Sequence, residues 1–233
     1  MCSDGRVAIV DPPQPDAEEL VRFIRMACHG LRNPLAIATG MLELLDRIAG
    51  DQLDDEARDL LERSSSAVRR TADMVLSIQR HVGAQHRPLQ QVPVDLGEVV
   101  AWVSEAFDPS ELVVQATGAM PTLVADRDMI EWVFHELFEN ARRHRDRAEP
   151  VTVVVEAVQD GDRCLVTVTD DGGGIPAGRH EEAFGEGAVL DRSGGGLGLG
   201  LAIVRLVLSR HGGDARLDDA PGGGLRAVLS WPI

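Results

Sequence analysis

The chain has 233 residues, of which 44% are hydrophobic, a share that is sufficient for a packed core and argues against intrinsic disorder. The formal net charge of −15 excludes the basic surface that nucleic acids and anionic membranes require. Three scattered cysteines form no CxxC motif, so neither a disulfide framework nor a zinc site is expected. With no apolar run near the roughly 20 residues of a membrane span and no signal-peptide pattern, we expect no membrane span and a cytoplasmic protein.

The N-terminal third has the pattern of a helical hairpin. Residues 1–16 hold three of the 12 prolines and are expected to form a loose leader. From residue 17, apolar residues recur in steps of three and four, and Gly50 and Asp51 interrupt the pattern. The second stripe keeps heptad spacing and contains Ala57, Leu61, Ser64, Val68, Thr71, Val75, Ile78 and Val82. We predict a hairpin over residues 17–83.

The two stripes are narrow, and two helices of this kind do not close a core alone. Pairing of two hairpins would give a dimeric four-helix bundle, so a homodimer is expected. The alternative is a hairpin that docks on the rest of its own chain.

Residues 84–93 are polar with two prolines and are predicted to be a linker. Beyond it, helix and strand patterns mix over residues 94–233. Helices are expected at 96–107, 128–144 and 199–211, and strands at 112–116, 122–124, 151–158, 164–169 and 225–231. Because the strands are mostly joined by hairpins, we predict an α+β chain whose second domain is an α/β sandwich with a mixed sheet.

Three segments carry chemistry. The sequence Asp-Asp-Gly-Gly-Gly-Ile at 170–175 follows a predicted strand, where a carboxylate can accept a hydrogen bond from an exocyclic amine; a plain turn is the alternative. The glycine-rich run 194–200 opens a helix, a place that favours phosphate; a flexible loop is the alternative. Glu136 and Asn140 are one turn apart on a helix and can hold Mg²⁺ or orient a water, although a solvated polar face is commoner.

The order of these segments, together with the hairpin, resembles the transmitter core of a two-component sensor histidine kinase over residues 17–233. The H box corresponds to residues 28–35 (CHGLRNPL), the N box to 136–144, and the glycine boxes to 170–175 and 196–201. The resemblance implies a dimerisation and histidine-phosphotransfer hairpin and a Bergerat-type ATP-binding domain. It also implies ATP and Mg²⁺ as cofactors and a response regulator receiver domain as partner, with input from a separate sensor protein, from the dimer core or from a longer chain.

By the same resemblance, His29 is the phosphoacceptor, and Asn33 matches the side chain that positions water in phosphatase reactions. Mg²⁺ would be held by Asn140 with Glu136 in support, and residues 176–195 would form the ATP lid. The remaining implied contacts are Arg143 and His144 to phosphates, Asp170 to the adenine amine, Gly172 and Gly174 for close approach, and Gly196, Gly198 and Gly200 around the phosphates.

Gly30 departs from the family, which usually has an acidic residue directly after the phosphoacceptor. Loss of that base would slow proton transfer by about 10²–10⁴-fold where this step limits the rate. The main reading is an autokinase that passes a phosphoryl group from His29 to a regulator. A phosphatase-biased or pseudokinase module, an ATPase with Glu136 as base and a non-enzymatic adaptor are the alternatives.

Overall fold

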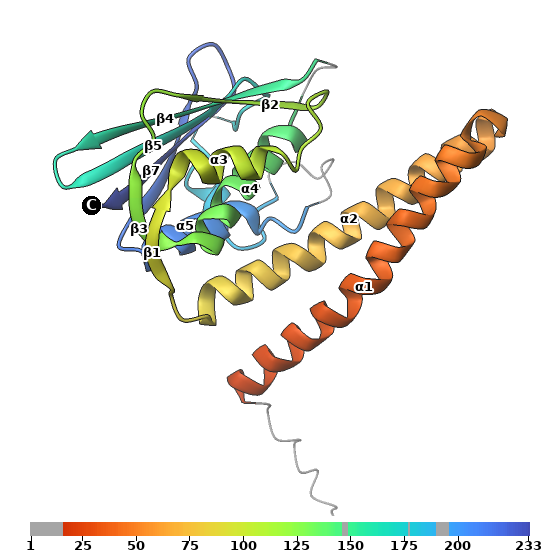
Figure 1. Ribbon diagram of the computed structural model, residues 1–233, viewed down its shortest axis with the longest axis horizontal. Coiled ribbons are helices and arrows are strands. Elements are labelled where there is room, and N and C mark those ends of the chain that lie inside the picture. The colour runs from red at the N-terminus through yellow and green to blue at the C-terminus, as the bar shows by residue number, and fades with distance from the viewer. Residues whose placement is uncertain (1–15, 146–148, 177, 190–195) are drawn as a thin grey trace, which may run out of the picture.

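The computed structural model describes residues 16–145, 149–176, 178–189 and 196–233 (Figure 1). Apart from Asp16, the expected leader lies outside the described residues, as do positions 177 and 190–195 of the expected lid. The described chain forms a long helical hairpin followed by an α/β domain, which is the predicted α+β class. None of the described helices is long and apolar enough to cross a bilayer.

The hairpin consists of α1 (Ala17–Ala49) and α2 (Asp55–His86), joined through the short 3₁₀ turn η1 (Gly50–Gln52). The turn falls where Gly50 and Asp51 interrupt the apolar pattern. Asp54 then caps α2, because its side chain accepts a hydrogen bond from the Ala57 amide at 2.8 Å. The predicted hairpin is therefore confirmed.

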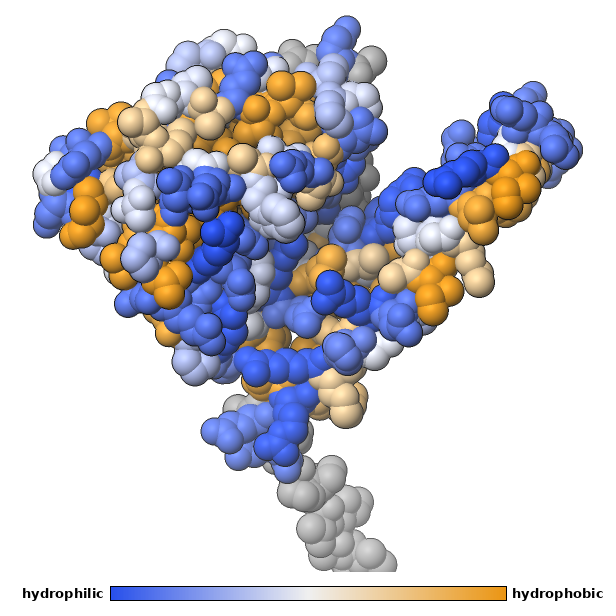
Figure 2. Space-filling model, viewed as in Figure 1, coloured by the Kyte–Doolittle hydropathy of each residue, from blue (hydrophilic) through white to orange (hydrophobic). Residues whose placement is uncertain are grey.

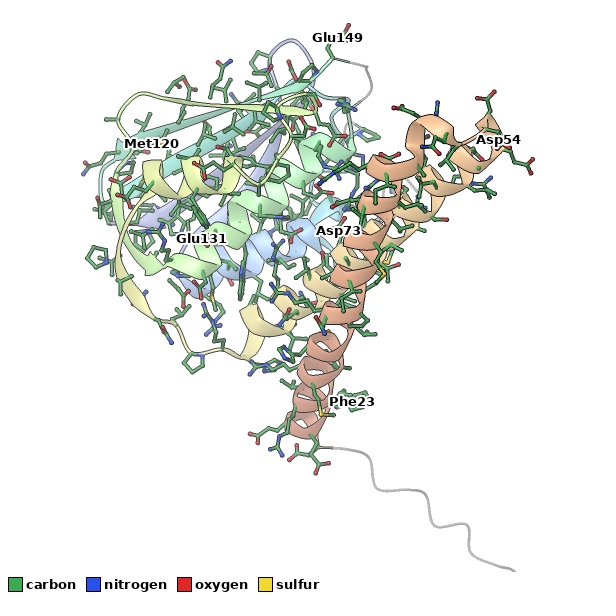
Figure 3. The ribbon with its side chains drawn as sticks, turned by 45° about the vertical axis from the view of Figure 1, so that its right-hand side comes forward. Phe23, Asp54, Asp73, Met120, Glu131 and Glu149 are labelled. Atoms are coloured by element: carbon green, nitrogen blue, oxygen red, sulfur yellow. The ribbon has the colours of Figure 1, made fainter. Side chains whose placement is uncertain are left out.

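Much of the apolar surface of α1 is left uncovered within the single chain. Figure 2 shows hydrophobic side chains along the hairpin, and in Figure 3 Phe23 points away from the α/β domain. The exposed large apolar residues of α1 are Leu20, Phe23, Met26, Leu31, Ile37, Met41, Leu44, Leu45 and Ile48. So long a set of exposed apolar side chains is typical of a surface that a partner covers.

The predicted linker, residues 84–93, differs from the structure at both ends. Helix α2 continues through His86, and strand β1 begins at Gln91. The physical reason is tertiary: Ala84 is fully buried in the core of the α/β domain, and Arg210 donates hydrogen bonds to the carbonyls of Ala84 and Arg87, both at 2.7 Å. These contacts satisfy carbonyl groups that a helix end otherwise leaves open.

The described strands form two sheets. Strands β1 (Gln91–Asp95) and β3 (Thr122–Asp126) make an antiparallel pair. The five-stranded sheet has the order β2-β4-β5-β7-β6, with β2 (Leu112–Thr117) parallel to β4 (Val151–Asp160) and the other neighbours antiparallel, so the predicted mixed sheet is confirmed. Its remaining strands are β5 (Arg163–Asp170), β6 (Asp214–Asp219) and β7 (Leu225–Pro232).

The helices α3 (Leu96–Ser104), α4 (Arg127–Arg143) and α5 (Gly200–Arg210) cover one face of the larger sheet (Figure 1). Side chains alternate along β4, so Val153 and Val155 are fully buried beneath these helices. On α4, Phe134 and Phe138 fill the same core, and burying each contributes roughly 1.5–3 kcal/mol. The packing holds α4 in place and leaves its C-terminal turns beside the end of β5.

Candidate active site

A cleft lies where the C-terminal half of α4, the segment after β5 and the start of α5 meet. Its volume is about 190 Å³. The predicted nucleotide-site residues that line it are Glu136, Asn140, Arg143, His144, Asp170, Gly174, Gly196, Gly198 and Gly200. Residues from three separate segments of the sequence are thus brought to one cavity. Gly172 stands just behind it, where its amide donates a hydrogen bond to Asp170 Oδ1 at 3.0 Å.

Asp170 is held at the end of β5 by the backbone of two neighbouring segments. Its Oδ1 atom accepts hydrogen bonds from the amides of Gly172, at 3.0 Å, and Leu225, at 3.1 Å. Burial raises the pKa of Asp170, and these hydrogen bonds oppose that shift because they favour the charged form. A fixed carboxylate inside a partly apolar cleft suits recognition of one hydrogen-bond donor of a ligand.

The glycines after β5 are required by close backbone approach. Gly174 has φ +67°, and a Cβ there would lie 3.0 Å from the carbonyl oxygen of Gly224. A Cβ at Gly172 would lie 3.1 Å from Asp170 Oδ1 and 3.4 Å from the carbonyl oxygen of His144. Side chains at these positions would push apart the segments that form the floor of the cleft. Gly224 was not among the predicted site residues, and its only signal is the run of glycines at 222–224.

Glu136 is buried and paired with a residue that the sequence did not single out. Arg80 of α2 donates a hydrogen bond from Nη1 to Glu136 Oε1 at 2.8 Å, and the same nitrogen lies 2.9 Å from Nδ1 of His135. Burial raises the pKa of Glu136, while Arg80 favours the charged form. Burial also lowers the pKa of His135 to about 4, and the Arg80 charge adds to this, so the imidazole is neutral at physiological pH and accepts from Arg80.

Arg143 is oriented toward the glycine-rich loop. Glu139 accepts hydrogen bonds from Arg142 Nη2 at 2.8 Å and from Arg143 Nη2 at 3.0 Å. Although burial works against it, these two arginines hold the pKa of Glu139 below its usual value. A Cβ at Gly196 would overlap Nη1 of Arg143. The loop can approach this cation only because residue 196 is glycine.

The loop itself is shaped by two further glycines and leads into α5. Gly198 has φ +67°, and its carbonyl accepts a hydrogen bond from the Gly187 amide at 3.1 Å. Gly200 starts α5, and a Cβ there would lie 2.9 Å from Glu136 Oε2. Open amides at the beginning of a helix, next to the Arg143 guanidinium, favour an anionic group such as phosphate.

The predicted phosphoacceptor residues lie on α1, away from this cleft. His29 and Asn33 are both exposed, whereas the neighbouring Cys28 is buried. Helix α2 contributes Ser77 to the cleft wall, and α1 contributes none of the described lining residues. The structure therefore does not bring His29 to the nucleotide-site residues of the same chain. Around Gly30, a Cβ would meet nothing within 4 Å.

Within the described ranges there is no group of three or more His, Cys, Asp or Glu side chains placed to hold a metal ion. The residues of the cleft still suit Mg²⁺, which commonly takes one or two protein oxygens and completes its shell with phosphates and water. Glu136 and Asn140 supply a carboxylate and an amide oxygen on one face of α4.

Two family models match the chain. The histidine kinase-, DNA gyrase B- and HSP90-like ATPase model matches residues 125–233, and the His kinase A (phospho-acceptor) domain model matches residues 19–79. The first covers α4, the larger sheet and the cleft, and the second covers most of the hairpin.

Three sensor proteins match most or nearly all of the chain. The alginate biosynthesis sensor protein KinB of Pseudomonas aeruginosa is 31% identical, over 99% of this chain and 40% of that protein. The probable sensor histidine kinase TcrY of Mycobacterium tuberculosis is 34% identical, over 88% of this chain and 45% of that protein. The sensor-like histidine kinase SenX3 of Mycolicibacterium smegmatis is 30% identical, over 98% of this chain and 63% of that protein. The chain thus spans about half the length of such relatives.

Solved structures share the fold. The full-length ShkA structure in complex with AMPPNP has a TM-score of 0.64 at 23% identity and covers 91% of this chain and 45% of its own. The mycobacterial sensor histidine kinase MprB has a TM-score of 0.54 at 26% identity and covers 61% of this chain and 97% of its own. With a phosphoacceptor-type hairpin, an ATPase-type domain and sensor kinases as relatives, the chain belongs to the two-component sensor histidine kinases and is a transmitter core of that family.

Proposed function

We propose that the chain is an ATP-dependent protein-histidine kinase that phosphorylates its own His29. An imidazole nitrogen attacks the γ-phosphorus of ATP, the new N–P bond forms, and the bond to the bridging oxygen breaks to release ADP. The phosphoryl group then passes to an aspartate of a response regulator receiver domain. Because His29 stands apart from the cleft of its own chain, the reaction requires either movement of the α/β domain or the cleft of a second copy.

The observation that carries this proposal is that a carboxylate, a glycine-rich stretch of backbone and a cation lie in one cleft. A half-buried Asp170, held by backbone amides, supplies an acceptor for the adenine amine. Gly196, Gly198 and Gly200 present backbone at the start of α5, where phosphates are favoured. Arg143 adds a cation beside that loop, and an arginine guanidinium forms strong, charge-assisted hydrogen bonds with phosphate oxygens.

Mg²⁺ would be held by Asn140 with Glu136 in support, and when bound it would neutralise charge on the transferring phosphoryl group. The remaining tasks belong to the chain itself. Arg143 and His144 border the phosphate end of the cleft, and Gly172 and Gly174 keep its floor open. Residues 176–195 would cover the nucleotide as a lid. We assign residues 17–83 to dimerisation and phosphotransfer and 94–233 to ATP binding.

We further propose a homodimer through the hairpin, since the exposed apolar stripe of α1 is what a second hairpin would cover. The reaction belongs in the cytoplasm, where ATP and Mg²⁺ are available. The signal would enter through a separate sensor protein, through the dimer core or through a longer chain.

One observation favours a second function, a phosphatase-biased module. Gly30 offers no carboxylate beside His29, so the autokinase lacks the usual proton acceptor at that position. Asn33 is exposed one turn from His29 and can orient water toward a phosphorylated aspartate of a bound regulator. In that case ATP acts as an effector of the phosphatase state.

Incubation with γ-labelled ATP separates the two functions. The kinase reading predicts label on the protein that is lost in acid and retained in base, as expected for phosphohistidine. It also predicts that His29→Gln removes the label and keeps ATP binding, because acceptor and nucleotide site lie in different parts of the chain. Label that persists in His29→Gln would contradict the assignment of His29. Absence of label, together with faster dephosphorylation of a phosphorylated regulator that Asn33→Ala abolishes, would favour the phosphatase.

A further inference from the structure

The C-terminal half of α2 is held against the α/β domain by side chains of several kinds. Figure 3 shows Asp73 at this boundary, where it lies within electrostatic reach of Glu139 and Arg143. Further along α2, His81 Nε2 lies 3.4 Å from Glu186 of the segment that follows η2 (Glu182–Phe184). At the end of the helix, a Cβ at Gly83 would lie 3.0 Å from the ring of Trp132. The hairpin is therefore docked directly beside the cleft.

Arg80 is the residue of this docked surface that contacts Glu136, one of the two residues proposed to hold Mg²⁺. The Arg80 side chain is 16% exposed and that of Glu136 only 7%, and the two are joined by the 2.8 Å hydrogen bond. A carboxylate buried to this extent is costly unless a cation or a proton compensates it. In the docked arrangement Arg80 supplies that compensation.

Glu136 uses one oxygen to pair with Arg80 and keeps the other beside the start of α5. Oε1 accepts a hydrogen bond from Arg80, and a Cβ at Gly200 would lie 2.9 Å from Oε2. A metal ion supported by Glu136 would need one of these oxygens and would bring a second positive charge next to the guanidinium. Two cations this close repel each other strongly in a buried site.

We propose that Arg80 and Mg²⁺ are alternative counterions of Glu136, so that docking of α2 and loading of Mg-ATP oppose one another. This inference rests on the proposed function, since it takes Glu136 to support Mg²⁺ in ATP binding. Arg80 is a positioning residue here, because it acts on the reaction only through Glu136.

Helix α2 also takes part in the cleft itself. Ser77 of α2 lies in the wall of the cleft, whose volume is about 190 Å³. The contact between His81 and Glu186 also ties α2 to the described part of the lid segment. Withdrawal of α2 would remove Ser77 from the cleft wall, release Glu186 and free Glu136 in one movement.

Trp132 provides a reporter of docking. It packs on Gly83 and lies under Arg87, whose Cζ is 5.3 Å from the ring centroid. The other tryptophans are on separate elements: Trp102 is exposed on α3, and Trp231 is buried in β7. A change in Trp132 emission therefore reports separation of α2 from α4, and a Trp132→Phe background identifies the signal.

The experiment compares the whole chain with Arg80→Gln, using AMPPNP as the nucleotide, with Mg²⁺ and with EDTA. We expect Arg80→Gln to show the emission of the undocked state before nucleotide is added and to bind Mg-AMPPNP roughly tenfold tighter than the wild type. The gain should be much smaller in EDTA, because it arises from Mg²⁺. The matched control is Arg70→Gln, an exposed arginine of the same helix, which should behave as the wild type.

Gly83→Ala tests the inference without touching the charges. The added methyl group presses on Trp132 and weakens docking, although alanine favours the helix itself. Tighter binding of Mg-AMPPNP is expected here too, by a smaller factor. Unchanged affinity in Arg80→Gln, an equal gain in EDTA, or opposite effects of the two variants would overturn the inference alone. Failure of the wild-type chain to bind Mg-AMPPNP at all would instead overturn the proposed function on which it rests.

Discussion

Gly224 lies directly against Asp170: a Cβ at Gly224 would overlap the backbone carbonyl oxygen of Asp170 and lie 3.0 Å from its Oδ1. Gly224 comes just before β7 and has φ +87°, a conformation that side chains disfavour. The position of the carboxylate in the cleft therefore depends on a glycine from a distant part of the sequence.

We expect Gly224→Ala to displace Asp170 and to weaken ATP binding by roughly tenfold or more, about 1.4 kcal/mol, in titration calorimetry. Gly222→Ala is the matched control, since Gly222 has φ +95° but nothing within 4 Å of a Cβ. The two variants share the backbone strain and differ in the overlap. Equal loss of affinity in both would show that the contact with Asp170 does not matter.

Asp170→Asn should separate folding from recognition. An asparagine oxygen can still accept from Gly172 and Leu225, but the amide nitrogen cannot accept from an adenine amine. ATP affinity should fall by roughly 1.5–3 kcal/mol, about 10- to 100-fold, while the melting temperature and the dimer stay near those of the wild type. Asp171→Asn, the same change one residue on and outside the cleft lining, should bind normally. Wild-type affinity in Asp170→Asn would refute the assignment of this carboxylate to the nucleotide.

Gly30→Glu should accelerate autophosphorylation. A carboxylate beside His29 can hold the imidazole proton during attack, and the exposed position leaves room for the side chain. The initial rate at saturating ATP should rise by up to roughly 10²–10⁴-fold. Helix stability should rise by about 1 kcal/mol, because glycine is the poorest helix former after proline.

Gly40→Glu separates these two effects. Gly40 is an exposed glycine of the same helix with nothing within 4 Å of a Cβ, and it lies about 16.5 Å along α1 from His29. It should gain stability with no change in rate. A Gly30→Glu variant no faster than Gly40→Glu would mean that the base is supplied elsewhere or that proton transfer does not limit the rate.

The exposed stripe of α1 should be the dimer contact. Met41 is 66% exposed in the single chain, and a charge at this position would be buried in a four-helix bundle. We expect Met41→Glu to be largely monomeric at micromolar concentration in sedimentation equilibrium. Val124→Glu, at a 67% exposed apolar residue of the α/β domain, should remain dimeric. A monomeric wild-type chain would remove the basis of the prediction.

Local patterns in the sequence predicted most of the individual elements. The hairpin of β4 and β5 turns at Gly161, which adopts φ +63°, as glycine between two β-branched runs indicates. Periodic apolar residues identified α4 and α5, because a helix repeats over a few neighbouring residues. Some of the residues that line the cleft, such as Asn140, Asp170 and Gly198, were also singled out from the sequence, since glycine and polar residues at element ends keep the same chemistry in any fold.

Local patterns did not predict the elements whose stability comes from partners far away in the sequence. Strand β1 contains Pro93 and overlaps the end of the predicted linker. Proline is tolerated in an edge strand, and β3 is the one described strand that pairs with β1. Strand β6 is rich in aspartate and is held at the sheet edge by pairing with β7. Helix α2 runs to His86 because Ala84 enters a core made by residues far away in the chain.

By itself, the sequence determined the elements with local periodicity, the H, N and glycine boxes and the apolar face of α1. Only the tertiary structure decided that Arg80 pairs with Glu136 and that Gly224 lies directly against Asp170. Helix periodicity places Arg80 on a face of α2 but does not say which of the chain's carboxylates that face will meet. Such pairs arise when segments more than 50 residues apart pack together, and they depend on burial and distance that no local pattern encodes.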